Sequence, residues 1–190
     1  MNVWDFDNTI YRGESGMHFF WYYLKRKPSL VRHAPKVFRG IYDYKRGNIG
    51  VDDVYKRVGD VLTSFLTEAG GKNLADDARD FWDKHEHRVL PFYAQLQQPD
   101  DLIISAGPEQ SLREICGRIG VKRFIGTVID DEERRVKFVC FRENKVKAFH
   151  EQYPGAQIEN FYTDSHNDKP MMDISKHVFL VKKGKVTQIK

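Results

Sequence analysis

Short apolar runs alternate with longer amphipathic segments along this chain, and that alternation is typical of an α/β protein. Helices are predicted at 109–119 and 145–153, and the stretch 136–141 is expected to pair with 127–130 as a small hairpin. Strands that alternate with helices favour a parallel sheet covered by helices on both faces. The other predicted strands are one that starts at residue 3 and ends at 6 or 7, then 102–105, 124–128, 160–163, 178–181 and 186–189.

The long segment between the first two predicted strands is too long for a loop, and its pattern is helical. Pro28, the stretch 47–50 and the pair Gly70-Gly71 divide it into separate helices. We therefore expect a core formed by 1–14 and 90–190, with residues 15–89 inserted as a helical domain. The helical patterns in the insert cover 17–25, 30–44, 51–66 and 74–89.

Composition is compatible with this plan and excludes several classes of protein. The chain has 190 residues, of which 31% are charged and 41% hydrophobic, and a net charge of +4 that suits anionic substrates but is too small to indicate nucleic-acid binding. No apolar run approaches the roughly 20 residues of a membrane span. Because the first strand begins at once and two cysteines give no disulfide framework, we expect no signal peptide, no stable membrane association and a cytoplasmic protein.

Two acids stand two positions apart directly after the first apolar run, at Asp5 and Asp7. Residues i and i+2 of a strand point the same way, so a strand that ends at Phe6 or Asp7 would present both carboxylates at the carboxyl edge of the sheet. Ligands bind at that edge in open α/β sheets, and Mg²⁺ favours one or two carboxylates. The pentapeptide alone fits an ordinary polar turn equally well.

A second group of acids, Asp164 and Asp168, follows the predicted strand at 160–163. Acids that leave two strands of the same sheet can converge on one cation. Between the two acid pairs lie Ser105, which ends an apolar run and precedes Ala106 and Gly107, and Lys145 at the start of a predicted helix. A hydroxyl, a backbone N–H and an ammonium group are all suited to bind a phosphate.

At these residues the chain resembles the haloacid dehalogenase superfamily, specifically the subfamily IB branch related to phosphoserine phosphatases. The sequence Asp5-Phe6-Asp7-Asn8-Thr9 is similar to the first motif of that family, Ser105 to the second, Lys145 to the third, and Asp164 with Asp168 to the fourth. The resemblance implies a Rossmann-like parallel sheet and a cap of the C1 type formed by the helical insert.

The resemblance also implies the chemistry. Asp5 would attack phosphorus and become an aspartyl-phosphate, and Asp7 would act first as an acid and then as a base. Thr9, Ser105 and the backbone at Ala106 and Gly107 would contact the phosphate. Mg²⁺ would be bound by Asp5, the backbone carbonyl of Asp7, Asp164 and, directly or through water, Asp168.

Four features in and near the motifs leave alternatives open. Lys147 stands two residues after Lys145 and could take its place. Arg142 and Glu143 occupy positions where relatives usually have glycine, so we expect the geometry of this loop to differ. His166, inside the fourth motif, either contacts substrate or faces water. Glu14 matches an acid that binds the substrate's amino group in phosphoserine phosphatases, but relatives with other substrates carry it too.

We therefore predict a Mg²⁺-dependent phosphatase that hydrolyses a small phosphorylated metabolite. A phosphotransferase that passes the phosphoryl group to an alcohol would use the same acids, and a regulatory protein could keep the fold without turnover. The aromatic run 19–23, next to basic residues, also fits a lipid phosphate, although aromatic packing inside the insert is the simpler interpretation.

Overall fold

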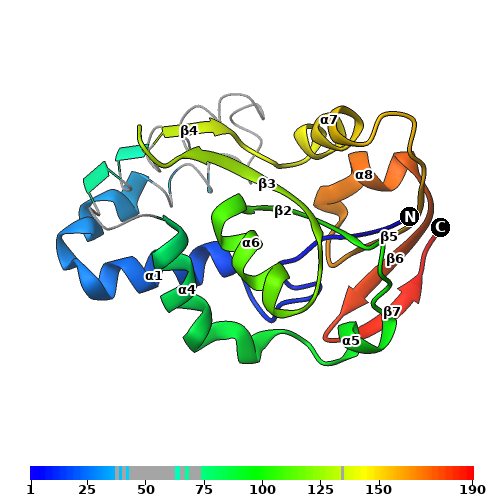
Figure 1. Ribbon diagram of the computed structural model, residues 1–190, viewed down its shortest axis with the longest axis horizontal. Helices are drawn as coiled ribbons and strands as arrows, with labels where there is room; N and C mark the ends of the chain where they lie inside the picture. Colours follow the sequence, from blue (N-terminus) through cyan, green and yellow to red (C-terminus); the bar gives the residue numbers. More distant parts are fainter. Residues whose placement is uncertain (37–38, 40–41, 43–62, 65–66, 69–73, 134) are drawn as a thin grey trace.

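The computed structural model describes residues 1–36, 39, 42, 63, 64, 67, 68, 74–133 and 135–190 (Figure 1). Among these residues no helix has both the length and the apolar character that a membrane crossing requires. The predicted helix at 51–66 lies almost entirely outside the described residues, as do the predicted breaks at 47–50 and at residues 70 and 71.

In the described part of the chain, seven strands form one sheet in the order β4-β3-β2-β1-β5-β6-β7. The five central strands run parallel, and the hairpin partners β4 and β7 add antiparallel edges. The predictions of a mostly parallel sheet and of the hairpin formed by β3 and β4 are thus confirmed, and β6 and β7 form a second hairpin. The strands are β1 (Asn2–Trp4), β2 (Leu102–Pro108), β3 (Arg123–Asp130), β4 (Arg135–Phe138), β5 (Ile158–Thr163), β6 (Ser175–Lys182) and β7 (Lys185–Gln188).

Helices cover both faces of the sheet, as the alternating pattern predicts (Figure 1). Trp4 and Ile103 point into a core shared with the helices α1 (Ser15–Arg26), α4 (Leu74–His85) and α6 (Glu109–Arg118). Their strand neighbours Val3 and Leu102 point the opposite way, toward α7 (Glu143–Gln152) and α8 (Lys169–Ile174). This alternation along the strands places one hydrophobic core on each side of the sheet.

Several helix boundaries differ from the prediction. The predicted helix at 30–44 begins as the 3-10 helix η1 (Pro28–His33), where Pro28 occupies the first turn. The predicted helix at 74–89 ends at His85 and continues as the 3-10 turn η2 (Glu86–Arg88). Two short helices, α5 (Phe92–Leu96) and α8, have too few residues to show a helical period in the sequence.

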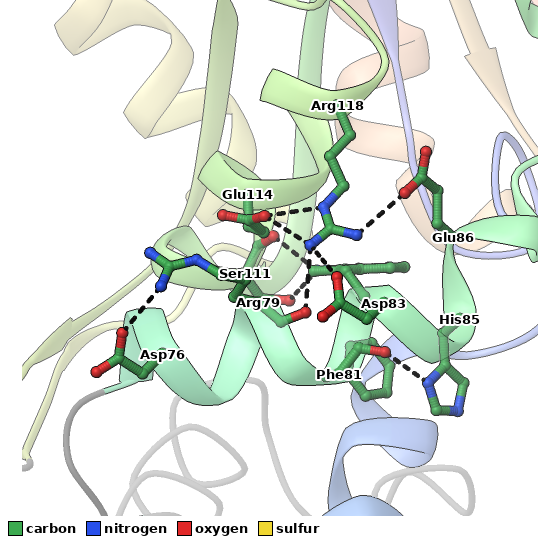
Figure 2. Close-up of polar contacts among 10 residues, drawn as sticks. Asp76, Arg79, Phe81, Asp83, His85, Glu86, Ser111, Glu114 and Arg118 are labelled. Atoms are coloured by element: carbon green, nitrogen blue, oxygen red, sulfur yellow. Dashed lines mark hydrogen bonds and ion pairs between the residues drawn. The ribbon is translucent and has the colours of Figure 1, made fainter.

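Helix α4 is fixed to the core helix α6 by buried and charged contacts. The indole N–H of Trp82 donates to the backbone oxygen of Ser111 at 2.9 Å and lies 3.1 Å from its Oγ. Figure 2 shows Arg118 of α6 reaching Asp83 of α4 at 2.7 Å and Glu86 at 3.1 Å. Although the sequence-based division assigns α4 to the insert, this helix rests on the core.

Replacing Trp82 with alanine tests how much this contact contributes to stability. Trp82 is fully buried between α4 and α6, so Trp82→Ala should lower the free energy of unfolding by about 3–5 kcal/mol. Trp21→Ala is the matched control, because the Trp21 side chain is 50% exposed and its loss should change stability little. Equilibrium urea unfolding measures both variants, and equal stability losses would contradict this account of the packing.

Candidate active site

An ammonium group held between two carboxylates lies at the carboxyl edge of the sheet. Lys145 Nζ is 2.8 Å from Asp5 Oδ1 and 2.9 Å from Asp168 Oδ1, and all three side chains are buried. The first, third and fourth predicted motifs therefore meet in space, although Asp5 and Lys145 are 140 residues apart in the chain. Lys147 is exposed, so the structure brings Lys145, and not Lys147, to this site.

Asp5 is positioned by the end of the central strand. Strand β1 stops at Trp4, and the prediction that it extends to Phe6 or Asp7 is wrong. The Asp5 N–H still donates to the Tyr162 oxygen of β5, but the Phe6 oxygen then accepts from the backbone N–H groups of Ile10 and Tyr11, both at 2.9 Å. The chain thus coils immediately after Asp5, which leaves the Asp5 carboxylate at the strand terminus.

The coil after Asp5 places three more predicted residues. Thr9 is fully buried and its hydroxyl donates to Asp5 Oδ2 at 3.1 Å. Asn8, with φ of 57°, takes the left-handed conformation that Asn tolerates, and its side-chain amide donates to Glu14 at 2.6 Å. Asp7 Oδ1 accepts the backbone N–H of Ser15 at 2.8 Å, at the first residue of α1. Asp7 therefore stabilises an otherwise unpaired N–H at the start of the inserted segment.

The second predicted motif forms an irregular turn within β2, at residues 105–107, where the pairing with β3 shifts register. Ser105 is buried, and its Oγ accepts the Gly107 N–H at 3.1 Å. Gly107 faces the start of α1, since a Cβ built on it would lie 4.0 Å from Ser15 Oγ. The Ala106 side chain is exposed and its backbone oxygen is bonded to Thr127. This turn lies beside the Asp7 segment, as expected for two neighbouring parallel strands.

The two acids of the fourth motif occupy different surroundings. Asp168 ends the 3-10 turn η3 (His166–Asp168), and its second oxygen, Oδ2, accepts the Thr163 hydroxyl at 3.0 Å. Both Asp168 oxygens therefore have partners, which fits a residue that orients Lys145. Asp164 is only partly buried, and Lys182 donates to its backbone oxygen. His166 is exposed.

Burial changes the acidity of these groups. It raises the pKa of Asp7 to about 6, against the hydrogen bond from Ser15. It also raises the pKa of Asp5 above its ordinary value, although the Lys145 charge opposes the shift. Burial raises the pKa of Asp164 as well, and the Glu14 and Asp168 charges add to that effect. The pKa of Lys145 is raised by its two carboxylate partners against the effect of burial, so it remains a cation.

The surplus of acids over cations is what a hard divalent ion would neutralise. In the part of the chain that the structure describes, no three Asp, Glu, His or Cys side chains gather closely enough to hold a metal by themselves. Mg²⁺ does not need such a cluster, because it takes one or two carboxylates, carbonyl oxygens and water. Asp5 and Asp164 directly follow the adjacent parallel strands β1 and β5, so they offer carboxylates for that smaller ligand set.

The turn before Lys145 contains Arg142, at a position where glycine is expected in relatives. Arg142 has φ of 48° and ψ of −118°, a conformation that glycine adopts much more readily. The turn is closed by the Lys145 N–H, which donates to the Arg142 oxygen at 3.0 Å. The missing glycine therefore leaves the position of Lys145 intact.

Comparisons with known proteins agree with this geometry. The sequence matches the profile of the haloacid dehalogenase-like hydrolases over residues 3–173. The chain therefore belongs to this family of hydrolases, and the prediction of family, fold and enzyme class is confirmed. A search of curated proteins gives no match.

Three solved structures share the fold at low sequence identity. A protein of unknown function from Bordetella pertussis Tohama I has a TM-score of 0.70 and 17% identity, over 94% of this chain and 87% of that one. A phosphoserine phosphohydrolase-like protein from Francisella tularensis has a TM-score of 0.62 and 14% identity, over 94% and 86%. A family hydrolase from Salmonella enterica serovar Typhi has a TM-score of 0.61 and 12% identity, over 91% and 58%.

Several residues that hold the site are absent from the sequence-based prediction. Thr163 and Ser15 bond directly to predicted acids, and Thr127 bonds to the turn after Ser105. Thr163 could have been found, because it is a polar residue at the buried end of a strand next to Asp164. Ser15 bonds Asp7 through both its backbone N–H and its side chain, but its place at the start of a helix does not identify an acid eight residues earlier as its partner.

Because the pKa of Asp7 is raised, Asp7→Asn should have a higher free energy of unfolding than the wild type, by an amount that depends on pH. The folded protein releases this proton at about pH 6 and the unfolded chain near 3.8, so ionisation of Asp7 destabilises the fold as pH rises between these values. Asp7→Asn should match the wild type below about pH 4 and be more stable above about pH 6, by up to roughly 3 kcal/mol.

Urea unfolding in the presence of a chelator, at about pH 4 and about pH 7.5, measures the difference in the free energy of unfolding between Asp7→Asn and the wild type. Asn can still accept the Ser15 N–H, so the comparison isolates the charge. The control is Glu151→Gln, because the exposed Glu151 side chain lies on α7 away from the site and its loss should change stability equally little at both pH values. A constant difference between Asp7→Asn and the wild type would contradict the assigned environment of Asp7.

Proposed function

We propose that this hydrolase is a Mg²⁺-dependent phosphomonoesterase that acts through an aspartyl-phosphate on Asp5. The observation that carries the proposal is the buried contact of Asp5 with Lys145, completed by Asp168. The adjacent ammonium opposes the effect of burial on the pKa of Asp5 and so favours the carboxylate form that attack requires. The same ammonium can bind an incoming phosphoryl group, which arrives as an anion.

Asp7 has the acidity that the second role requires. A pKa of about 6 keeps part of the population protonated near neutral pH, so Asp7 can donate a proton to the leaving oxygen. The resulting carboxylate can then accept a proton from the water that hydrolyses the intermediate. Its bond from the Ser15 N–H fixes the orientation of the carboxyl group.

The turn within β2 and the acidic residues, through a bound metal ion, would stabilise the charge on the transferred phosphoryl group. Ser105 Oγ and the Gly107 N–H would turn from each other toward phosphoryl oxygens, while Lys145 supplies a full positive charge. The metal would be held by Asp5, Asp164 and the backbone carbonyl of Asp7, with Asp168 acting mainly through Lys145. When bound, Mg²⁺ neutralises charge that develops on the transferred group.

The inserted segment would select the substrate. Helix α1 starts at the residue that contacts Asp7, so residues 15–89, the proposed cap, leave the core at the site itself. Glu14 stands at that junction, oriented by Asn8, and its charge acts on both Asp7 and Asp164. A carboxylate there favours a small phosphorylated metabolite that carries a cationic group close to the phosphate.

Phosphate release from a panel of phosphomonoesters tests the proposed function. The panel should include phosphoserine, sugar phosphates, nucleotides and lysolipid phosphates, each with Mg²⁺ and with chelator. We expect release that requires Mg²⁺ and is at least about a thousandfold lower in Asp5→Asn, because the near-isosteric amide cannot attack phosphorus.

Glu143→Gln is the matched control, because the exposed Glu143 carboxylate lies outside the site. Full activity in Asp5→Asn would refute the nucleophile. New phosphoesters after the addition of alcohols would instead identify a phosphotransferase. Silence across the panel would favour a regulatory protein.

A further inference from the structure

We propose that Gly126 and Thr127, two neighbouring residues of β3, are positioning residues that shape the turn at 105–107 and connect it to the segment before Lys145. The inference rests on the proposed function, because it assigns that turn to phosphate binding. The segment 102–145, which contains both residues, resembles the family branch throughout, but neither residue belongs to the four predicted motifs. Each is placed by its own contacts with the turn.

The turn interrupts the pairing of β2 with β3. Ile104 pairs with Ile125 in the regular ladder, but the register then shifts, and the next pair is Pro108 with Thr127. On β2 three residues, 105–107, separate these pairs, whereas on β3 only Gly126 does. The extra residues leave the ladder, so contacts other than the regular strand pairing must set their conformation.

The hydroxyl of Thr127 supplies two such contacts. It donates to the Ala106 oxygen at 2.7 Å and accepts the Cys140 N–H at 3.2 Å. Thr127 is only 2% exposed, so water cannot replace either partner if the hydroxyl is lost. One buried hydroxyl therefore holds the centre of the turn from one side and the segment leading to Lys145 from the other.

Gly126 supplies the complementary contact by having no side chain. A Cβ at this position would lie 2.7 Å from the Gly107 oxygen and 2.7 Å from Leu112 Cδ1. Both distances are shorter than real Cβ contacts, and the first involves backbone that cannot rotate away. The Gly107 carbonyl thus lies directly against β3, and the Gly107 N–H, on the other side of the same Cα, donates to Ser105 Oγ.

The connection to Lys145 runs through a short and well-bonded segment. After Cys140, the Asn144 side chain donates to the Val139 oxygen at 3.0 Å, and the Lys145 N–H donates to the Arg142 oxygen at 3.0 Å. A shift of Cys140 would therefore be passed to the start of α7. Thr127 fixes the distance between the proposed phosphate donors and the ammonium that shares the phosphate with them.

The test compares two substitutions of Thr127. Thr127→Val keeps the branched shape and strand preference but loses both hydrogen bonds, whereas Thr127→Ser keeps the hydroxyl. With Mg²⁺ present, Thr127→Val should weaken inorganic phosphate binding, measured by calorimetry, and lower kcat/KM by about 10-fold or more. For Thr127→Ser, both phosphate affinity and kcat/KM should stay within about threefold of the wild type. Thr187→Val, a control at an exposed position of β7, should change neither quantity.

A structural readout accompanies the binding measurement. The Cys140 amide loses its acceptor in Thr127→Val, so its hydrogen exchange should become at least about tenfold faster, while Thr127→Ser should keep it protected. Gly126→Ala should also weaken phosphate binding with the hydroxyl still in place, because its Cβ displaces Gly107. Circular dichroism confirms that each variant is folded.

The outcomes separate the inference from the proposed function. Wild-type phosphate binding and turnover in a folded Thr127→Val would overturn the positioning role and leave the proposed function standing. A wild type that neither binds nor releases phosphate would overturn the proposed function. The connection through Thr127 is then decided by Cys140 exchange alone, where unchanged protection in Thr127→Val overturns it and faster exchange supports it.

Discussion

The contact of Lys145 with Asp5 and Asp168 is the interaction on which the rest of the site depends. Three buried charges of mixed sign are stable only together, because removing one partner from a buried ion pair typically costs about 3–5 kcal/mol. With both carboxylates ionised, the group carries one net negative charge, which a bound cation would neutralise, and the same charges are suited to the proposed phosphoryl transfer. Structural stability and proposed chemistry thus place the same constraint on this edge of the sheet.

Sheet topology explains how residues from distant parts of the chain reach that edge. The central strand β1 lies between β2 and β5, and all three run parallel. The residues at their carboxyl ends therefore lie at the same edge of the sheet. Asp5 and Asp164 directly follow β1 and β5, and Ser105 lies where the regular pairing of β2 is interrupted. The inserted segment begins at Ser15, which bonds to Asp7, so a change in the insert acts directly on the proposed acid and base.

The sheet, most helices and the converging acids could be predicted because they depend on local periods and on strand direction. The end of β1 could not, because the turn at Phe6 arises from backbone hydrogen bonds that leave no apolar pattern. The roles of Thr163 and Thr127 depend on partners in other strands or loops, which a period cannot reveal. At Arg142 the sequence predicts an altered loop, but in the structure Arg142 takes a backbone conformation that glycine usually adopts.

The most direct test of the central claim is to trap the covalent intermediate. Wild-type protein turning over a substrate from the phosphomonoester panel with Mg²⁺ is quenched in acid and digested with pepsin at acid pH, where an acyl phosphate persists. The peptide that contains Asp5 and Asp7 is then sequenced by mass spectrometry. The account predicts a phosphoryl group on Asp5. Phosphate release with the group on another residue would contradict it.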